Sequence, residues 1–242
     1  WILLGYLFQK RAQTGFTRAR VVSAPGLIIF AFSVTFAAVD WIMSLEPHWF
    51  STIYGAIFLV GQTLQTFAFC IALLALLSHR EPFASILDPS HFHDLGNLLL
   101  AFTALWAYTS FSQFLIIWSG HIPEETVWYV RRSNGVWQFV SVVLVAFHFA
   151  VPFAILLSRK MKRQGHRLAV VAIWIIGMRL VDLVYWTEPA YEHQDLLMLW
   201  VRAAALLGIG GLWLAFFTWQ LRRQQPIVDV RDPRLAVEGV VH

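Results

Sequence analysis

Four ionisable residues lie in segments that are otherwise apolar enough to span a bilayer: Asp40, Arg179, Asp182 and Arg202. Charged groups at membrane depth are costly and usually mark a functional site. Arg179, Asp182 and Tyr185 follow one another at intervals of three residues, so they share one helix face, and the first two can pair along the helix. Two carboxylates, two guanidiniums and a phenol are suited to proton transfer or to binding the head group of a quinone. The same set would also serve as an ion-pair network that only fixes helix packing.

Further candidates for proton transfer lie close to these charges in the predicted membrane. His148 falls near the middle of an apolar segment, where an imidazole could relay protons; it could equally be a core histidine bonded to a backbone carbonyl. Glu188 follows the segment that carries Asp182, and we include it in the proton pathway. Glu46 and His48 lie in the turn after Asp40, which we interpret as a possible quinone or proton-exit region.

Metal and haem ligation are not predicted for this chain. A b-type haem needs axial ligands from facing helices, and no second histidine lies at the depth of His148. The single Cys70 cannot form an internal disulfide, an iron–sulfur site or a C-x-x-C-H haem attachment. The pair His91-x-His93 beside Asp94 is more typical of a solvated interface than of a metal site. We therefore expect no metal site and no cofactor bound by this chain, except possible quinone.

The elements that position these residues are predicted to be membrane-spanning helices. The chain is 58% hydrophobic and 13% charged, with a mean hydropathy of +0.62, whereas soluble domains are roughly 45–50% apolar and 25% charged. A span needs about 20 apolar residues. The sequence predicts an all-α polytopic bundle with six such spans, at residues 25–44, 53–77, 96–118, 136–157, 168–186 and 196–219.

The remaining segments complete a division of the chain into three parts. Residues 1–24 are interpreted as the end of an upstream membrane helix followed by a cytoplasmic loop, residues 25–220 as the six-helix transmembrane domain, and residues 221–242 as a polar cytoplasmic tail. Pro152 lies inside the fourth span and should kink it, leaving the carbonyl of His148 without its usual partner. Seven tryptophans, among them Trp49, Trp128 and Trp186, fall near predicted outer helix ends and are interpreted as an aromatic belt.

The distribution of Lys and Arg predicts the orientation. Fourteen of the 18 cations fall on one side of the predicted spans, and only Arg131 and Arg132 fall on the other. Since cations near membrane ends favour the cytoplasm, both ends of the chain should be cytoplasmic, and the loops at about 45–52, 119–135 and 187–195 should face outward. The net charge of +4 is then an insertion signal, and we expect membrane lipid but no nucleic acid among the partners.

Five stretches of the sequence form specific motifs: DWIMSLEPHWFSTIYG at 40–55, HDLGNLLL at 93–100, WAY at 106–108, FSQFLIIW at 111–118 and IPEETVWY at 122–129. These stretches resemble the F-type membrane subunits of bacterial alternative complex III, which belong to the NrfD/polysulfide-reductase membrane family. The similarity extends over roughly residues 25–220 and is densest between 40 and 135.

This resemblance implies a subunit of a quinol:electron-acceptor oxidoreductase of a respiratory or photosynthetic chain in the bacterial inner (cytoplasmic) membrane. It implies NrfD-like four-helix bundles, a paralogous NrfD-like partner, and multihaem cytochrome c and iron–sulfur partner subunits that hold the c-type haems and clusters. Family members place membrane acids and histidines at positions matching the Asp40–His48 turn, His148 and the Arg179, Asp182 pair. The F-type subunit is expected to supply a proton pathway without redox centres of its own, and a quinone contact is compatible with this role.

Two other classes of function use the same residues. A secondary transporter or ion channel would employ the buried charges for coupling, although the repeats and broken helices typical of such proteins are not visible in the sequence. A structural scaffold for peripheral redox subunits would need the charges only for packing.

Overall fold

The computed structural model describes residues 2–12, 16–81, 83–191 and 196–223. These residues form helices joined by short connections, and no strand occurs among them. The chain divides into two compact units, which are described separately: Ser23–Ala190, and a second unit made of Ile2–Val22 with the chain from Tyr191 onward. The protein is therefore an all-α polytopic helical bundle, as the sequence predicts.

Six helices are long and apolar enough to cross a membrane, in agreement with the six predicted spans. Their ends differ from the prediction by several residues, most of all for the third, which begins at a proline seven residues before the predicted start. These segments are Val21–Leu45, Tyr54–Leu77, Pro89–Gly120, Gly135–Leu157, Gly165–Ala190 and Trp200–Arg222.

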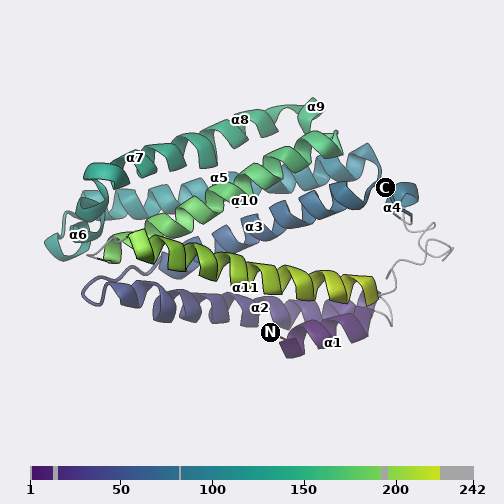
Figure 1. The fold of residues 1–242 in the computed structure, drawn as a ribbon, viewed down its shortest axis with the longest axis horizontal. Coiled ribbons are helices and arrows are strands. Elements are labelled where there is room, and N and C mark those ends of the chain that lie inside the picture. The colour runs from purple at the N-terminus through teal and green to yellow at the C-terminus, as the bar shows by residue number, and fades with distance from the viewer. Residues whose placement is uncertain (1, 13–15, 82, 192–195, 224–242) are drawn as a thin grey trace. The chain divides into compact units, whose positions relative to one another are not determined.

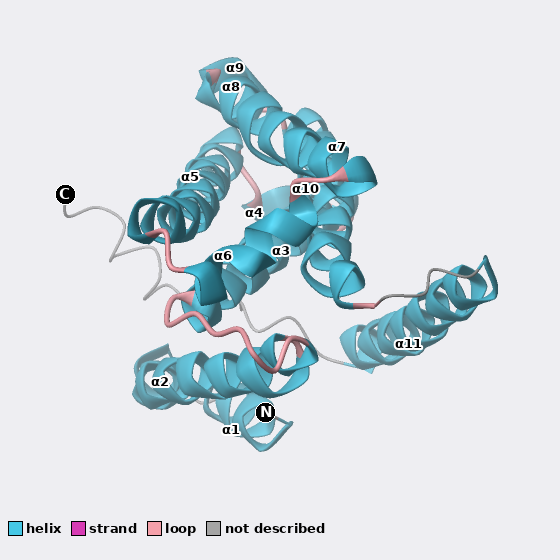
Figure 2. Ribbon diagram, turned by 90° about the vertical axis from the view of Figure 1, so that its left-hand side faces the viewer, coloured by secondary structure: helices cyan, strands magenta, loops and turns pink. Residues whose placement is uncertain are grey.

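Four of the spans form a bundle in the first unit. They are α3 (Tyr54–Leu77), α5 (Pro89–Gly120), the span made of α7 (Gly135–Val143), η2 (Leu144–Ala150) and α8 (Val151–Leu157), and α10 (Gly165–Thr187). Helix α3 packs between α5 and α10, and α5 packs along α8, so that the four spans surround a shared axis (Figure 2). The part of α2 (Phe16–Trp41) from Ser23 onward also belongs to this unit and packs Val34 and Ala38 against α3.

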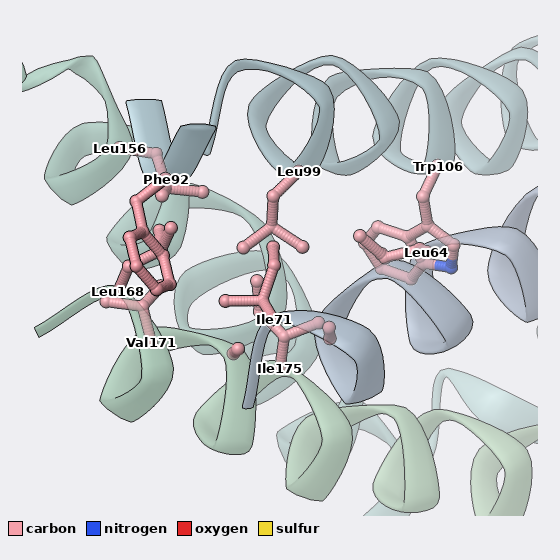
Figure 3. Close-up of a cluster of buried hydrophobic side chains, with 11 residues drawn as sticks. Leu64, Ile71, Phe92, Leu99, Trp106, Leu156, Leu168, Val171 and Ile175 are labelled. Atoms are coloured by element: carbon pink, nitrogen blue, oxygen red, sulfur yellow. The ribbon is translucent and has the colours of Figure 1, made fainter. Parts of the chain in front are cut away.

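The apolar core of the bundle follows from a seven-residue spacing. Phe92, Leu99 and Trp106 lie seven residues apart on α5 and form one stripe of that helix. They face Leu64 and Ile71 of α3, together with residues of α8 and α10 (Figure 3). The outward side chains of the same helices are also apolar, as expected for helices that contact lipid.

Short helices connect the spans: η1 (Met43–Leu45), α4 (Phe83–Ile86), α6 (Pro123–Arg132), α9 (Arg159–Lys162) and η3 (Glu188–Ala190). Helix α6 lies at one end of the bundle, near the beginning of α7 (Figures 1 and 2). Residues 119–135 were predicted only as a loop. A proline in the first turn, two glutamates after it and two arginines in the last turn all favour a helix here, because they suit the free N–H groups and the helix dipole.

The fourth span is disturbed where the sequence predicts a kink. Residues Leu144–Ala150 form a π-helical segment just before Pro152, and the N–H of Val151 donates to the carbonyl of Ala146, five residues back. Because Pro152 has no N–H to donate, the helix loses one ordinary bond at this point in any case. The wide turn places the disturbance ahead of the proline and turns His148 into the bundle, where it is fully buried.

The second unit contains α1 (Ile2–Ala12), the start of α2 and α11 (Leu196–Arg223). In it the guanidinium of Arg202 lies 5.3 Å from the ring centre of Tyr191. Residues Ile2–Ala12 are helical, and residues 16–24, which were expected to be a loop, form the start of α2 instead. Most of the predicted tail, from residue 224 onward, lies outside the described residues.

Candidate functional site

A cavity of about 640 Å³ lies in the first unit and is lined by residues of α5, α6, α7, η2 and α10. Most of its wall is apolar and aromatic, with Trp106, Phe111 and Phe114 contributed by α5. Asp182 and Tyr185 of α10 also line it. A mainly apolar cavity of this size with a few convergent polar groups is typical of a small-molecule site.

Asp182 accepts hydrogen bonds from three buried side chains. Its carboxylate forms an ion pair with Arg179, one turn earlier on α10, and both side chains are buried. The indole Nε1 of Trp106 donates to Oδ2 at 3.1 Å, and that of Trp186 donates to Oδ1 at 3.0 Å. The pairing predicted from the three-residue spacing is confirmed. Three donors therefore converge on this one carboxylate.

The guanidinium of Arg179, which pairs with Asp182 on the same helix, lies against the surface of α3. A Cβ atom at Gly61 of α3 would collide with the guanidinium, its Nε lying 2.9 Å away, so only glycine leaves this space open. The guanidinium also lies 5.5 Å from the ring centre of Phe58. Its Nε and Nη2 atoms are buried and have no hydrogen-bond partner among the described residues. They remain available to a polar group that enters the bundle.

His148 lies one residue layer behind the cavity wall. Its ring packs edge-on against Trp106, with ring centres 4.1 Å apart and an interplanar angle of 85°. The side chain is fully buried, and within the described part of the chain neither ring nitrogen has a hydrogen-bond partner. The interpretation of His148 as a core histidine bonded to a backbone carbonyl is therefore wrong, whereas a role in proton exchange stays open.

Tyr185 places a hydroxyl group at the polar part of the cavity. Its Oη lies 3.2 Å from Oγ of Ser141 on α7, and both residues line the cavity. This pair links α10 to α7 and provides hydroxyl groups that can donate or accept a hydrogen bond.

A second charged group, which the sequence analysis missed, joins Glu46 to α6. The carboxylate accepts from Arg132 Nη2 at 3.0 Å and from Arg131 Nη1 at 3.2 Å. Arg132 is buried, and this burial lowers the pKa of its guanidinium, which the charge of Glu46 opposes. Both arginines were predicted only as cations of an outward loop. The signal that could have revealed them is the charge pattern of α6, with acids in its first turn and bases in its last.

Three other predicted site residues of the first unit are not assembled with Asp182. Asp40 is exposed at the end of α2, so the expectation that it is buried in a cluster of four charges is wrong; it lies where the chain leaves the helix. His48 is exposed, and Glu188 is half-buried in η3. Arg202 belongs to the second unit. Among the described residues, no group of three or more His, Cys, Asp or Glu side chains could hold a metal ion.

Three tryptophans assigned to the aromatic belt are instead buried together. Trp128 of α6 stacks on Trp49 with ring centres 5.3 Å apart and packs on Trp186 at 4.9 Å. The indole N–H of Trp49 donates to the carbonyl of Glu125 at 3.0 Å. The belt interpretation is wrong for these residues because α6 covers them, although other members of the set are exposed, including Trp41 and Trp118.

No protein-family model matches this chain, and no curated protein matches it. The chemical interpretation of the site therefore depends on the geometry of its side chains and on the resemblance of the sequence motifs. The features that matter most are the aromatic cavity, the carboxylate of Asp182 with its three donors, and the unbonded ring of His148.

Proposed function

We propose that this chain is an integral membrane subunit of a quinol-oxidising electron-transfer complex, and that its cavity takes the ring of a quinol. The observation that carries the proposal is the cavity of about 640 Å³, whose aromatic walls meet Asp182 and Tyr185. Its volume suits a ligand of moderate size. Its apolar walls suit a ring, and its polar groups suit the ring oxygens. The motif resemblance to F-type subunits of alternative complex III supports the same conclusion.

Quinol oxidation releases two electrons and two protons for each quinone formed, so the protein must accept protons near the ring. Asp182 is surrounded by three donors and therefore serves best to orient a hydroxyl group. His148 has two ring nitrogens without hydrogen-bond partners among the described residues, and we assign it the role of proton acceptor. Tyr185 and Ser141 can pass a proton between hydroxyl groups. Glu188 and the Glu46–His48 turn continue the proposed route toward the outer side.

The electrons would leave through partner subunits. The resemblance suggests a paralogous NrfD-like subunit, a multihaem cytochrome c and iron–sulfur subunits in the bacterial inner membrane. The distribution of Lys and Arg favours an orientation with both ends of this chain cytoplasmic. Under this proposal the chain positions the quinol and handles protons, and the c-type haems and clusters of its partners carry the electrons.

A pair of matched variants tests the site. Val145 lines the cavity and is 64% exposed, whereas Val136, in the same span, is 72% exposed and lies outside the lining. Because both positions are open, a tryptophan fits at either without overpacking the core. Val145→Trp should lower kcat/KM for quinol in the purified complex by about tenfold or more, and Val136→Trp should leave it within about twofold. Wild-type kcat/KM in Val145→Trp would contradict a quinol in this cavity.

The two alternatives predict other results. A scaffold would retain quinol oxidation in Val145→Trp and lose it only when the complex fails to assemble. A transporter or channel would purify without haem or iron–sulfur partners and would move a solute or ion in vesicles that contain this chain alone. Co-isolation of redox partners together with sensitivity to Val145→Trp would contradict both alternatives.

A further inference from the structure

Helix α6 forms one end of the cavity. Trp128, Tyr129, Arg132 and Ser133, all at its C-terminal end, line the cavity together with the bundle helices. Trp128 and Arg132 are buried, whereas Val127 and Val130 on the opposite face are exposed. The helix therefore turns one face toward the cavity and the other away from the bundle.

The end of α10 presents carbonyl groups that its own helix cannot satisfy. The last carbonyls of a helix lack partners four residues ahead, and for Tyr185 that position is Pro189, which has no N–H. Arg132 supplies the missing donors. Its Nε donates to the carbonyl of Tyr185 at 3.1 Å, and its Nη2 donates to the carbonyl of Trp186 at 3.1 Å.

The same guanidinium connects two further segments. Nη2 also donates to Glu46 in the turn that follows α2, and Nη1 donates to the carbonyl of Trp128 within α6. The guanidinium carbon lies 3.6 Å from the ring centre of Trp128. Every nitrogen of Arg132 is thus bonded, and one side chain joins α6, the end of α10 and the turn after α2. A planar guanidinium can do this, whereas an ammonium group has no such fixed fork.

We propose that Arg132 is a positioning residue that holds α6 as the end cover of the cavity, with Glu46 as its counter-charge. While the cover is in place, it excludes water from the polar part of the cavity and fixes the end of α10, where Trp186 bonds Asp182. The cover itself does not depend on which ligand the cavity takes. Its consequence for quinol turnover rests on the proposed function.

Arg131 provides a matched control, because it neighbours Arg132, carries the same charge and contacts the same carboxylate. It differs in being 51% exposed and in making a single bond to Oε2 of Glu46. Loss of Arg131 removes one cation from the surface. Loss of Arg132 removes the bonds to α10 as well.

The test measures entry of a charged, water-soluble thiol reagent into the cavity. Ser110→Cys, in a Cys70→Ala background, places a thiol on the cavity wall, and opened membranes give the reagent access from both sides. Arg132→Gln should increase the labelling rate by about tenfold or more, and Arg131→Gln should leave it within about twofold. Ser119→Cys, already exposed near the C-terminal end of α5, reports any general change in access of the reagent, and its labelling should not change.

Equal labelling of the Ser110→Cys thiol in the Arg131→Gln and Arg132→Gln proteins would overturn the proposal, and so would a parallel increase at Ser119→Cys. If Arg132→Gln yields no folded protein, Arg132→Lys is tested in its place, because it keeps the positive charge but loses the planar arrangement of donors. An increase of about tenfold supports the cover, and a rate within about twofold of the parent overturns it. A short-tailed quinone added to the parent tests the ligand separately. If Arg132→Gln increases the labelling rate of the Ser110→Cys thiol but added quinone does not slow labelling of the parent, the role of α6 as a cover is supported and the proposed function is contradicted.

Discussion

Asp182→Asn should destabilise the bundle strongly, because this carboxylate accepts hydrogen bonds from three donors at once. An amide has one acceptor oxygen and one NH₂ group. Whichever way it is turned, its NH₂ group faces a donor, either the indole of Trp186 on one side or Arg179 and Trp106 on the other. Arg179 also loses its only ion-pair partner among the described residues while remaining buried.

The size of the effect can be estimated from the two losses. Removing one partner of a buried ion pair costs about 3–5 kcal/mol, and leaving a buried donor unsatisfied costs about 1–3 kcal/mol. Because the two losses share the same carboxylate, they do not simply add. We expect a total decrease of about 3–5 kcal/mol in the free energy of unfolding. Adding Arg179→Gln removes the uncompensated charge and should recover about 2 kcal/mol.

The assay is thermal or denaturant unfolding of the purified protein in detergent, for both single variants and the double variant. Asp94→Asn is the control, because Asp94 is 78% exposed and lies 3.6 Å from the ring of His93; it should change stability by less than about 0.5 kcal/mol. Additive effects of the Arg179 and Asp182 substitutions would refute the shared network. An effect of Asp182→Asn as small as that of Asp94→Asn would refute the reasoning about the carboxylate.

Three further predictions concern packing, pH and orientation. Gly61→Ala should lower stability by about 1–3 kcal/mol because its methyl group meets the buried guanidinium, whereas Gly177→Ala, which meets nothing within 4 Å, should be neutral or stabilising in the same unfolding assay. Burial raises the pKa of Tyr129, so the folded state holds this proton more tightly. The contribution of this phenol to the free energy of unfolding is present below about pH 10 and decreases as the pH rises further. Tyr129→Phe should make the loss of stability above this pH smaller, and an unchanged dependence of stability on pH would contradict the role of Tyr129. In sealed cells, a reagent added outside should label a Glu125→Cys variant but not a Lys162→Cys variant. Labelling of Lys162→Cys from outside would reverse the predicted orientation.

The sequence predicted the part of the site that lies on one helix. Arg179 and Asp182 are three residues apart, and helix geometry alone places them in contact. Their other partners come from distant segments, since Trp106 lies 76 residues before Asp182, and no local spacing indicates such a contact. For Asp40 the sequence was misleading. Its neighbours are apolar, which suggested burial, but the residue lies at the end of α2 and its side chain is exposed.

The fold was predictable where apolar stretches are long. Each of the six spans carries enough consecutive apolar residues to be recognised, whereas α6 has ten residues, four of them charged, and is too short for its pattern to decide. The exposed and buried tryptophans have the same positions relative to predicted helix ends. Only the placement of α6 separates those that anchor the surface from those that fill the interior.

The three buried indoles of Trp49, Trp128 and Trp186 have an optical consequence. They come from a connecting turn, from α6 and from α10, and adjacent rings lie 5.3 and 4.9 Å apart. Chromophores this close couple their excited states, so the trio should give a strong near-ultraviolet circular dichroism signal that a separated tryptophan does not. The middle ring belongs to α6. Movement of this one helix would therefore uncouple the transitions, and the protein contains its own spectroscopic reporter of whether that end of the bundle is closed.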